Sequence, residues 1–444
     1  MSKLKLGLVN LGCDKNRIDG EIMLSTLYNK YDLAKEPEDA DIILVNTCGF
    51  IESSKQESID TILEMARYKE NKCKVLLATG CLTQRYGKEL LELMPELDGI
   101  LGVNNYSDID RLIKNALSKE EKLCCCNYSD TNINEGERIL TTDSHYAYIR
   151  ISEGCDNACA YCAIPKIRGK YRSRTMESIL KEANSLANQG VKELIIVAQD
   201  TTRYGVDIYG EKNLHVLLRK LSEIEKIEWI RILYCYAEEL TEDIINEIAD
   251  NDKVCKYIDI PLQHISDDVL KAMRRKGRRA LITKNIGKLR EKIKEINIRT
   301  TYIVGFPGEK EANFEELMKF TEEAKFDKLG VFKYSREENT AAYDMENQIS
   351  EETKEIREAE IMFLQQRISK EINEKKVGKV YNVIVDNFDG EMYHGRNYEM
   401  APEVDGEIIF TSENNIKLGS FIKVRITEAL EYDLIGVVEN ELSE

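Results

Sequence analysis

The sequence predicts an α/β protein of three consecutive units: a parallel-sheet domain, a partial (β/α)6 barrel and a small antiparallel β-barrel. Strand-like apolar runs alternate with helix-like segments from residue 4 to residue 334, and short strands separated by turns fill residues 377–438. A chain of 444 residues is too long for one ordinary core and fits about three domains. We place the units at residues 2–118, 141–371 and 374–440.

In the first unit, three strand-like runs each end in a turn that carries one cysteine. The runs cover residues 4–9, 41–45 and 74–78, and the cysteines that follow them are Cys13, Cys48 and Cys81. Helix-like segments such as residues 51–68 separate the runs, which predicts a parallel sheet with both faces covered. Loops at the carboxyl ends of parallel strands open on one side, so the three thiols can meet there as a cluster site. Three half-buried cysteines at strand ends are the alternative interpretation.

Residues 118–136 are predicted to form a polar connector with a short strand, centred on Cys124, Cys125 and Cys126. Neighbouring residues of an extended chain point to opposite faces, so three consecutive cysteines chelate a metal poorly. We interpret these three as inert thiols. The same interpretation applies to Cys73, Cys235 and Cys255.

The second unit opens with a strand and a loop that carries Cys155, Cys159 and Cys162 in a C-x3-C-x2-C spacing. Three thiolates on one loop can bind three irons of a cubane cluster and leave the fourth iron open to a small molecule with an amine and a carboxylate. A three-cysteine zinc loop and reduced structural thiols are alternatives. However, no histidine lies near enough in the sequence to complete a zinc knuckle.

Six strand-then-helix repeats are predicted to build the second unit. The strands are expected at residues 146–151, 194–198, 229–233, 257–260, 300–304 and 329–334, and the helices at residues 176–188, 214–224, 241–249, 267–273, 280–296 and 311–324. Right-handed connections curl such repeats into a barrel, and six repeats leave the barrel open. The active face of this architecture is the carboxyl end of the strands, where the cysteine loop is expected.

Four further residues at strand ends are candidates for contacts with a small molecule. Gly305 and Gly308 allow the backbone to approach a ligand closely, and Gln199 and Gln263 offer side-chain hydrogen bonds at the rim. The basic run at residues 274–279 is interpreted as a solvated loop, with a contact to phosphate or to an acidic partner as the alternative.

A charged helix-like segment at residues 350–375 leads to the third unit. Strands are expected there at residues 380–385, 407–410, 421–426 and 434–438, with turns at 389–390 and 418–419, which indicates a small β-barrel. Residues 374–439 contain seven Lys or Arg against thirteen Asp or Glu, a net charge of -6. An acidic barrel binds phosphates poorly and suits a basic protein partner.

Composition places the chain among globular cytoplasmic proteins. It contains 42% hydrophobic and 32% charged residues, no apolar run reaches the ~18 residues of a membrane span, and the first residues lead into a strand rather than a signal peptide. The net charge of -17 argues against broad attraction to nucleic acid. Twelve cysteines in an intracellular chain are interpreted as metal ligands or inert thiols rather than disulfides.

Together these features resemble the radical SAM methylthiotransferase family, where SAM is S-adenosyl-L-methionine, over nearly the whole chain. Family members carry an amino-terminal domain with three cluster cysteines, a radical SAM barrel and a carboxyl-terminal TRAM barrel, in that order. The resemblance implies two 4Fe-4S clusters. The first cluster would be bound by Cys13, Cys48 and Cys81, and the second, with an exchangeable SAM, by Cys155, Cys159 and Cys162.

Four motifs are similar to the branch of this family that modifies an aspartate of small-subunit ribosomal protein number twelve. They lie at residues 12–16, 46–51, 261–264 and 401–406. The branch that modifies an adenosine in transfer RNA typically has a glutamine before the asparagine of the first motif, where this chain has Lys15. That branch also has a Gln-Ser-Gly run where this chain has Gln263, His264 and Ile265. One departure from the ribosomal-protein branch is Asp14, where proline is common.

The resemblance implies an activity and its partners. SAM at the second cluster would start a radical reaction at the β-carbon of the aspartate, the first cluster would supply sulfur, and a second SAM would supply the methyl group. Gly305, Gly308, Gln199 and Gln263 are the candidate SAM contacts. The implied partners are the basic ribosomal protein and a low-potential electron donor such as flavodoxin or ferredoxin. Methylthiolation of transfer RNA is one alternative, and an electron carrier or binding protein without catalysis is another.

Overall fold

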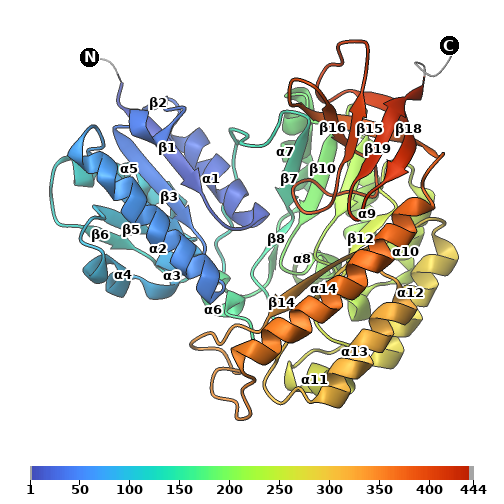
Figure 1. The fold of residues 1–444 in the computed structure, drawn as a ribbon. Helices are drawn as coiled ribbons and strands as arrows, with labels where there is room; N and C mark the ends of the chain where they lie inside the picture. Colours follow the sequence, from blue (N-terminus) through green and yellow to red (C-terminus); the bar gives the residue numbers. More distant parts are fainter. Residues whose placement is uncertain (1–2, 440–444) are drawn as a thin grey trace.

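The computed structural model describes residues 3–439 and contains the three predicted units in chain order (Figure 1). The first unit is drawn in blue and cyan, the second in green to orange, and the third in red. The predicted start at residue 2 and the predicted end at residue 440 lie outside the described residues, and the other predicted boundaries stay predictions.

The first unit is a parallel sheet of six strands in the order β2-β1-β3-β4-β5-β6, with helices on both faces. β3 and β4 are buried along their whole length, as expected of central strands covered on both sides. The three predicted strands and the predicted helix after residue 51 are confirmed. The strands are β1 (Lys5–Asn10), β2 (Asp32–Leu33), β3 (Ile42–Thr47), β4 (Val75–Gly80), β5 (Gly99–Leu101) and β6 (Leu123–Cys125), and the helices are α1 (Asp14–Leu27), α2 (Glu52–Ala66), α3 (Cys81–Tyr86), α4 (Lys88–Leu93) and α5 (Ile109–Leu117).

The second unit is the predicted open barrel. Six parallel strands form two three-stranded sheets, β11-β10-β7 and β12-β13-β14, which adjoin where Ile230 bridges to Val254. All six predicted strands are confirmed: β7 (Tyr146–Arg150), β10 (Glu193–Val197), β11 (Trp229–Ile232), β12 (Tyr257–Asp259), β13 (Asn297–Val304) and β14 (Lys328–Lys333). A two-stranded ribbon of β8 (Ser152–Glu153) and β9 (Arg172–Ser173) flanks the loop that carries Cys155, Cys159 and Cys162.

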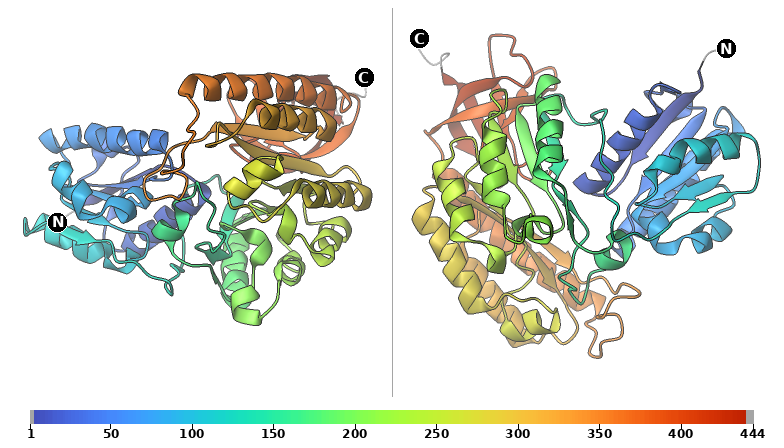
Figure 2. Two further views of the ribbon diagram at one scale, coloured as in Figure 1. Left: turned by 90° about the horizontal axis from the view of Figure 1, so that it is seen from below. Right: turned by 180° about the vertical axis from the view of Figure 1, so that it is seen from behind.

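Helices cover the outer side of the barrel strands (Figure 2). The six predicted helices are confirmed as α7 (Met176–Asn188), α9 (Leu214–Ser222), α10 (Glu242–Asp250), α11 (Asp267–Ala272), α12 (Arg279–Lys292) and α13 (Glu311–Ala324). Two short helices, α6 (Ile164–Arg168) and α8 (Val206–Tyr209), were not predicted, because four or five residues are too few to show a helical period.

The third unit is a closed five-stranded barrel reached through the predicted helix α14 (Glu351–Glu374). Its strand order is β15-β16-β17-β19-β18, and all neighbours are antiparallel except β17 and β19, which are parallel. β16 was not predicted. Its Gly395 packs against the backbone of Ile384 and interrupts the apolar alternation that marks a strand. The strands are β15 (Val380–Phe388), β16 (Tyr393–Arg396), β17 (Ile408–Thr411), β18 (Phe421–Ala429) and β19 (Leu434–Val438).

Each unit has a core of its own, and one further buried hydrophobic cluster contains residues of all three units. Ile18 and Ile22 of α1 pack in the same buried cluster as the inward-facing side chains of β7, β10 and β11 and as Ile384 and Ala401 of the third unit. α1 therefore lies on the side of the first unit that faces the barrel (Figures 1 and 2). Ion pairing adds to this contact, because Arg17 lies 2.8 Å from Glu403.

The loop at residues 401–406 is anchored inside the barrel. Tyr257 donates a hydrogen bond of 2.8 Å to Asp405, and Tyr146 donates one of 3.2 Å to Glu403. One of the four motifs that resemble the ribosomal-protein branch is thus a contact between the third unit and the barrel.

Within residues 3–439, no helix combines the length and apolar character that crossing a bilayer requires.

Candidate functional site

Glycines bring the three cysteine loops of the first unit into contact. A Cβ on Gly12 would lie 2.9 Å from Cβ of Cys48, and one on Gly49 would lie 2.7 Å from Cα of Leu82, beside Cys81. Gly80 has a φ of 101°, and a Cβ there would lie 2.5 Å from the Thr47 carbonyl oxygen. Only glycine fits such approaches, so Cys13, Cys48 and Cys81 meet at the carboxyl ends of β1, β3 and β4.

Polar groups hold the first cysteine set in place. Asn16 donates a hydrogen bond of 2.9 Å to the Thr47 carbonyl, and the Cys48 N–H donates one of 3.0 Å to Ser58. Burial raises the pKa of the Cys81 thiol to about 12, although the Arg168 guanidinium acts in the opposite direction. Metal binding to such a thiol displaces its proton, because the thiolate is the ligand.

The second cysteine set lies on the loop between β8 and α6. Gly154 has a φ of 76° and sits against the Lys170 backbone, and the Cys155 N–H donates a hydrogen bond of 3.1 Å to the Gly169 carbonyl. The Ala160 N–H donates one of 2.9 Å to the Met273 carbonyl at the end of α11. Burial raises the pKa of the Cys155 thiol to about 11, against the effect of the Asn157 N–H. The loop is therefore fixed at its start and middle.

Gln199 lies beside the start of this loop, Gln263 follows β12, and each has an unused acceptor. Their amide oxygens are buried and have no hydrogen-bond partner within the described part of the chain. Gln199 donates a hydrogen bond of 3.0 Å to Glu153, and Gln263 adopts a φ of 70°, which is unusual for a side chain of its size. Unpaired buried acceptors at the carboxyl ends of strands suit a bound polar molecule.

Gly305 and Gly308 both adopt left-handed backbone conformations after β13, with φ values of 70° and 83°. The Gly305 N–H donates a hydrogen bond of 2.9 Å to Glu309, and a Cβ on Gly305 would clash with Lys354 of α14. In contrast, nothing lies within 4 Å of a Cβ built on Gly308. Gly305 therefore leaves room for Lys354 of α14 to pack closely. Contact of either glycine with SAM stays a prediction.

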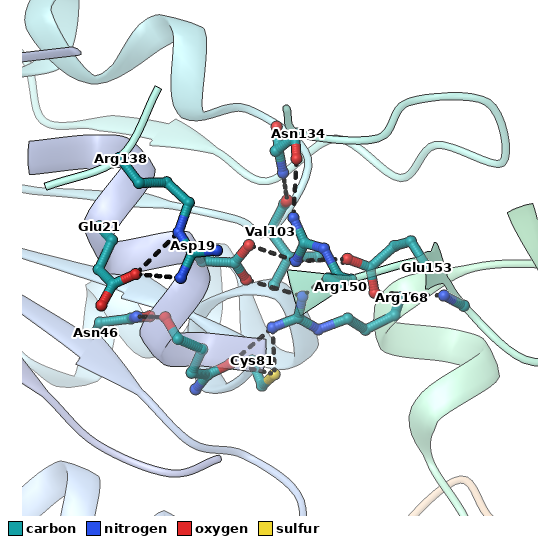
Figure 3. Close-up of polar contacts among 12 residues, drawn as sticks. Asp19, Glu21, Asn46, Cys81, Val103, Asn134, Arg138, Arg150, Glu153 and Arg168 are labelled. Atoms are coloured by element: carbon teal, nitrogen blue, oxygen red, sulfur yellow. Dashed lines mark hydrogen bonds and ion pairs between the residues drawn. The ribbon is translucent and has the colours of Figure 1, made fainter. Parts of the chain in front are cut away.

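Arg168, which follows the second cysteine loop, contacts a member of the first cysteine set (Figure 3). Its Nη2 lies 2.6 Å from Oδ1 of Asn16 and 3.5 Å from Sγ of Cys81, although Arg168 itself comes six residues after Cys162. Next to it, Ala163 and Ile167 pack against Cys81. The helix that follows the second cysteine loop therefore packs against Cys81 of the first set, at the contact between the first unit and the barrel.

Arg168 is part of a buried ion-pair network that the sequence did not reveal. Arg168 lies 2.8 Å from Asp19 and 3.2 Å from Glu153, and Arg150 lies 2.6 Å from Asp19 and 2.8 Å from Glu153. Burial alone would raise the pKa of Glu153, but the guanidinium groups of Arg168 and Arg150 outweigh it and lower that pKa. The one available signal was the charged Arg150 at the end of an apolar strand.

The other cysteines are predicted to be inert thiols, whereas Arg275 of the basic run lies close enough to Cys159 and Cys162 for its charge to act on them. Cys124 and Cys125 belong to the short connector strand β6, which confirms the predicted strand, and Cys73, Cys235 and Cys255 are buried. The basic run is only partly solvated. Arg275 is buried, its guanidinium lies 4.2 Å from the centre of the Tyr236 ring, and it donates a hydrogen bond of 3.0 Å to the Pro261 carbonyl.

The donor sets fit iron–sulfur clusters in their chemistry. Each set offers three thiols, which is the ligand type that such clusters take. A carboxylate stands next to a cysteine in each set, but Asp14 accepts a hydrogen bond from the Tyr234 hydroxyl and Asp156 accepts one from the Tyr171 N–H. Within residues 3–439, no three His, Cys, Asp or Glu side chains gather closely enough to hold a single metal ion. A cubane cluster needs a wider arrangement, because each thiolate binds a different iron.

Family models match all three units. Residues 5–102 match the Uncharacterized protein family UPF0004, residues 149–321 match the Radical SAM superfamily, and residues 377–438 match the TRAM domain. These three ranges lie in the parallel-sheet unit, the open barrel and the closed barrel, respectively.

Curated relatives match the chain from end to end. The protein named ribosomal protein uS12 methylthiotransferase RimO from Clostridium acetobutylicum is 60% identical over 444 residues, covering 100% of both chains. Proteins of the same name from Clostridium tetani and Clostridium novyi are 59% and 61% identical over 441 residues, covering 99% of each chain.

Solved structures share the fold at low identity. The radical S-adenosylmethionine methyltransferase TsrM from Kitasatospora setae, with cobalamin and a 4Fe-4S cluster bound, has a TM-score of 0.57 and 13% identity, covering 88% of this chain and 82% of that one. The cobalamin-dependent S-adenosylmethionine radical enzyme OxsB has a TM-score of 0.53 and 14% identity, covering 83% of this chain and 56% of that one. At these identities the likeness shows the fold alone.

Proposed function

The chain belongs to the ribosomal protein uS12 methylthiotransferases named RimO, and from this membership we propose that it adds a methylthio group to the β-carbon of an aspartate of uS12. The observation that carries the proposal is that the helix directly after the cysteine loop of the barrel contacts Cys81 of the first cysteine set, through Arg168, Ala163 and Ile167. A reaction that combines radical formation with sulfur insertion needs two separate iron sites within reach of one substrate atom, and this arrangement supplies ligands for both.

We assign one 4Fe-4S cluster to Cys13, Cys48 and Cys81 and a second to Cys155, Cys159 and Cys162. When bound, the clusters and SAM would supply the chemistry that removes a hydrogen atom from an unactivated C–H bond. They would also supply the sulfur atom and the methyl group that take the place of that hydrogen. The remaining work falls to the protein. Arg168 places a positive charge beside Cys81, and the unpaired amide oxygens of Gln199 and Gln263 offer acceptors to SAM.

The acidic third unit supports a basic protein partner rather than RNA. Residues 374–439 carry a net charge of -6, which repels phosphates and attracts a lysine- and arginine-rich ribosomal protein. We infer that the enzyme works in the cytoplasm, where ribosomal proteins are made, and that flavodoxin or ferredoxin supplies the electron.

The proposal is tested by deleting the gene in the source organism and analysing two substrates by mass spectrometry. uS12 from the deletion strain should lack the methylthio group, while the methylthio-adenosine content of digested transfer RNA should not change. Wild-type protein should restore the modification, and a Cys155→Ala variant should not. If the deletion strain instead loses methylthio-adenosine, and uS12 is already unmodified in the wild type, the enzyme acts on transfer RNA.

A further inference from the structure

Lys15 is a buried ammonium group without a carboxylate partner. It lies in the first turn of α1, two residues after Cys13, with only 8% of its surface exposed. Its Nζ lies 3.3 Å from the centre of the Tyr234 ring, and no carboxylate oxygen of residues 3–439 lies within 4.0 Å. A buried charge without an ion-pair partner in contact reduces stability, so its presence calls for a functional reason.

Other lysines buried to the same degree show the usual arrangement. Lys55 lies 2.5 Å from Glu52, Lys354 lies 2.6 Å from Glu351, and Lys376 lies 2.6 Å from Glu399. Lys328 also lacks a carboxylate within 4.0 Å among the described residues, but it begins β14 at the amino end of the barrel strands. Lys15 is thus the unpaired buried lysine at the end where the cysteines lie.

Two carboxylates near Lys15 are engaged elsewhere. Asp14 accepts a hydrogen bond of 3.1 Å from the Tyr234 hydroxyl, and Asp259 accepts one of 2.9 Å from the Tyr234 N–H. Tyr234 holds this position with a φ of 60°, a conformation that is strained for a bulky residue and typical of functional sites. Tyr234 therefore donates a hydrogen bond to each acid, while the free Oδ1 of Asp259 lies 3.7 Å from Arg299. Among the described residues neither acid forms an ion pair with Lys15 within 4.0 Å, so the lysine can bind a further anion.

The first turn of α1 contributes backbone N–H groups beside Lys15, together with the carboxylate of Asp14 that Tyr234 binds. No side chain caps the helix at Cys13, so the first N–H groups of α1 have no side-chain acceptor there and favour an anion. Tyr234 follows β11, on the carboxyl face of the barrel, and Cys13 is exposed beside it. An anion at Lys15 would therefore lie between the barrel face and the first cysteine set.

We propose that Lys15 binds the side-chain carboxylate of the substrate aspartate. This inference rests on the proposed function and names the residue that orients its target. The carbon to be modified is bonded directly to that carboxylate carbon, so a group that holds the carboxylate must lie close to the sulfur-bearing cluster. Lys15, two residues from Cys13, meets this requirement. The Tyr234 ring fixes the ammonium so that one charge-assisted hydrogen bond forms without further ordering.

The test measures binding of labelled uS12 to the reconstituted enzyme, without reductant, so that no turnover occurs. Two forms of uS12 are compared, one with the target aspartate and one with asparagine in its place. Lys15→Met should weaken binding of the aspartate form roughly 10- to 100-fold and leave the asparagine form nearly unchanged. Lys15→Arg should keep most of the affinity. Lys30→Met, which removes an exposed partner of Asp110, is the matched control and should change neither form.

Further measurements separate this role from others. A structural role for Lys15 predicts a lower melting temperature for Lys15→Met, whereas a ligand-binding role predicts an equal or higher one, because the unpaired charge is removed. Equal weakening of both uS12 forms, or a lower melting temperature, would overturn the inference. Weaker SAM binding by Lys15→Met in the absence of uS12 would assign the lysine to the SAM carboxylate and would also overturn it. If the wild-type enzyme does not modify uS12, the proposed function itself is refuted. If Lys15→Met binds the aspartate form of uS12 as tightly as the wild type does, only the role of Lys15 is refuted.

Discussion

At the scale of single residues, the buried charges between the first unit and the barrel carry most of the new information. Arg168 and Arg150 share Asp19 and Glu153, and the side chains of all four are almost fully buried. Each charge is compensated only while its partners are present. Removing one member therefore leaves an uncompensated charge in a region of low dielectric constant.

Arg168→Met should lower the free energy of unfolding by about 3 to 5 kcal/mol, because Asp19 and Glu153 lose a buried partner. Arg367→Met is the matched control. Arg367 pairs with Glu322 at 3.2 Å on the surface, so its loss should cost less than about 1 kcal/mol. Urea denaturation of both variants measures the difference, and equal losses would show that the network does not stabilise the interface.

The cysteine assignment predicts how iron content depends on each set. Replacing Cys13, Cys48 and Cys81 together with alanine should reduce iron from about eight to about four atoms per chain after anaerobic reconstitution. The same change at Cys124, Cys125 and Cys126 should leave iron unchanged, because these residues are interpreted as inert thiols. Iron and labile sulfide assays give the result. An equal loss in both triple variants would contradict the assignment.

The six candidate cysteines could be selected from the sequence because their spacing and their positions after strands are local features. The residues that support them could not. Arg168 contacts Cys81 and Asn16 across 87 and 152 residues of chain, and a lone arginine in a five-residue helix looks like a solvent-exposed residue. Lys15 shows no sign in the sequence that it is buried, because its cover is Tyr234 of the barrel.

At the scale of elements, the start of β10 shows how the third unit is attached. Glu193 is fully buried and accepts hydrogen bonds of 2.7 Å from Arg231 of β11 and from Arg396 of β16. Burial acts to raise the pKa of Glu193, but the guanidinium groups of Arg396 and Arg231 outweigh it, and the pKa is lowered from its ordinary value of 4.5. One carboxylate thus connects the two barrels.

This lowered pKa predicts a pH dependence. The stability that Glu193 contributes is fully present above the ordinary pKa of 4.5 that it has in the unfolded chain, and it is lost as the pH falls toward the lower folded value. The stability difference between the wild type and Glu193→Gln should therefore be largest near pH 7 and should shrink below about pH 4. Urea denaturation across this range measures it, and a difference that is constant with pH would contradict the assignment.

Most elements were predictable because each is long enough to show the apolar periodicity of a helix or a strand. The six barrel strands and the 14-residue helix α13 lie where the apolar pattern places them. β16 was missed because a glycine and a buried arginine occupy its end, and both are required by their surroundings rather than by strand propensity. Gly395 fits against Ile384, and Arg396 reaches Glu193.

At the scale of the whole molecule, the buried hydrophobic cluster that contains residues of all three units predicts one cooperative unfolding transition. Ile18→Ala should lower the free energy of unfolding by about 2 to 5 kcal/mol and should shift the melting of all three units together. Leu93→Ala is the matched control, because Leu93 is largely exposed. Calorimetry that shows separate peaks, with only the first one shifted, would contradict this prediction.

The order and type of the three units could be predicted, but their joint packing could not. Local patterns identify α1 as a helix of a parallel-sheet domain, whereas its partners include Ile384 and Ala401, more than 360 residues further along the chain. Contacts between residues so far apart in the sequence produce no local periodic pattern from which they could be predicted. The role of residues 401–406 as an anchor inside the barrel was hidden for the same reason.

The salt bridge between Arg17 and Glu403 sets an order for biosynthesis. α1 is translated among the first residues, yet its last packing partners emerge only when the chain is nearly finished, so folding of the nascent polypeptide ends with a long-range closure.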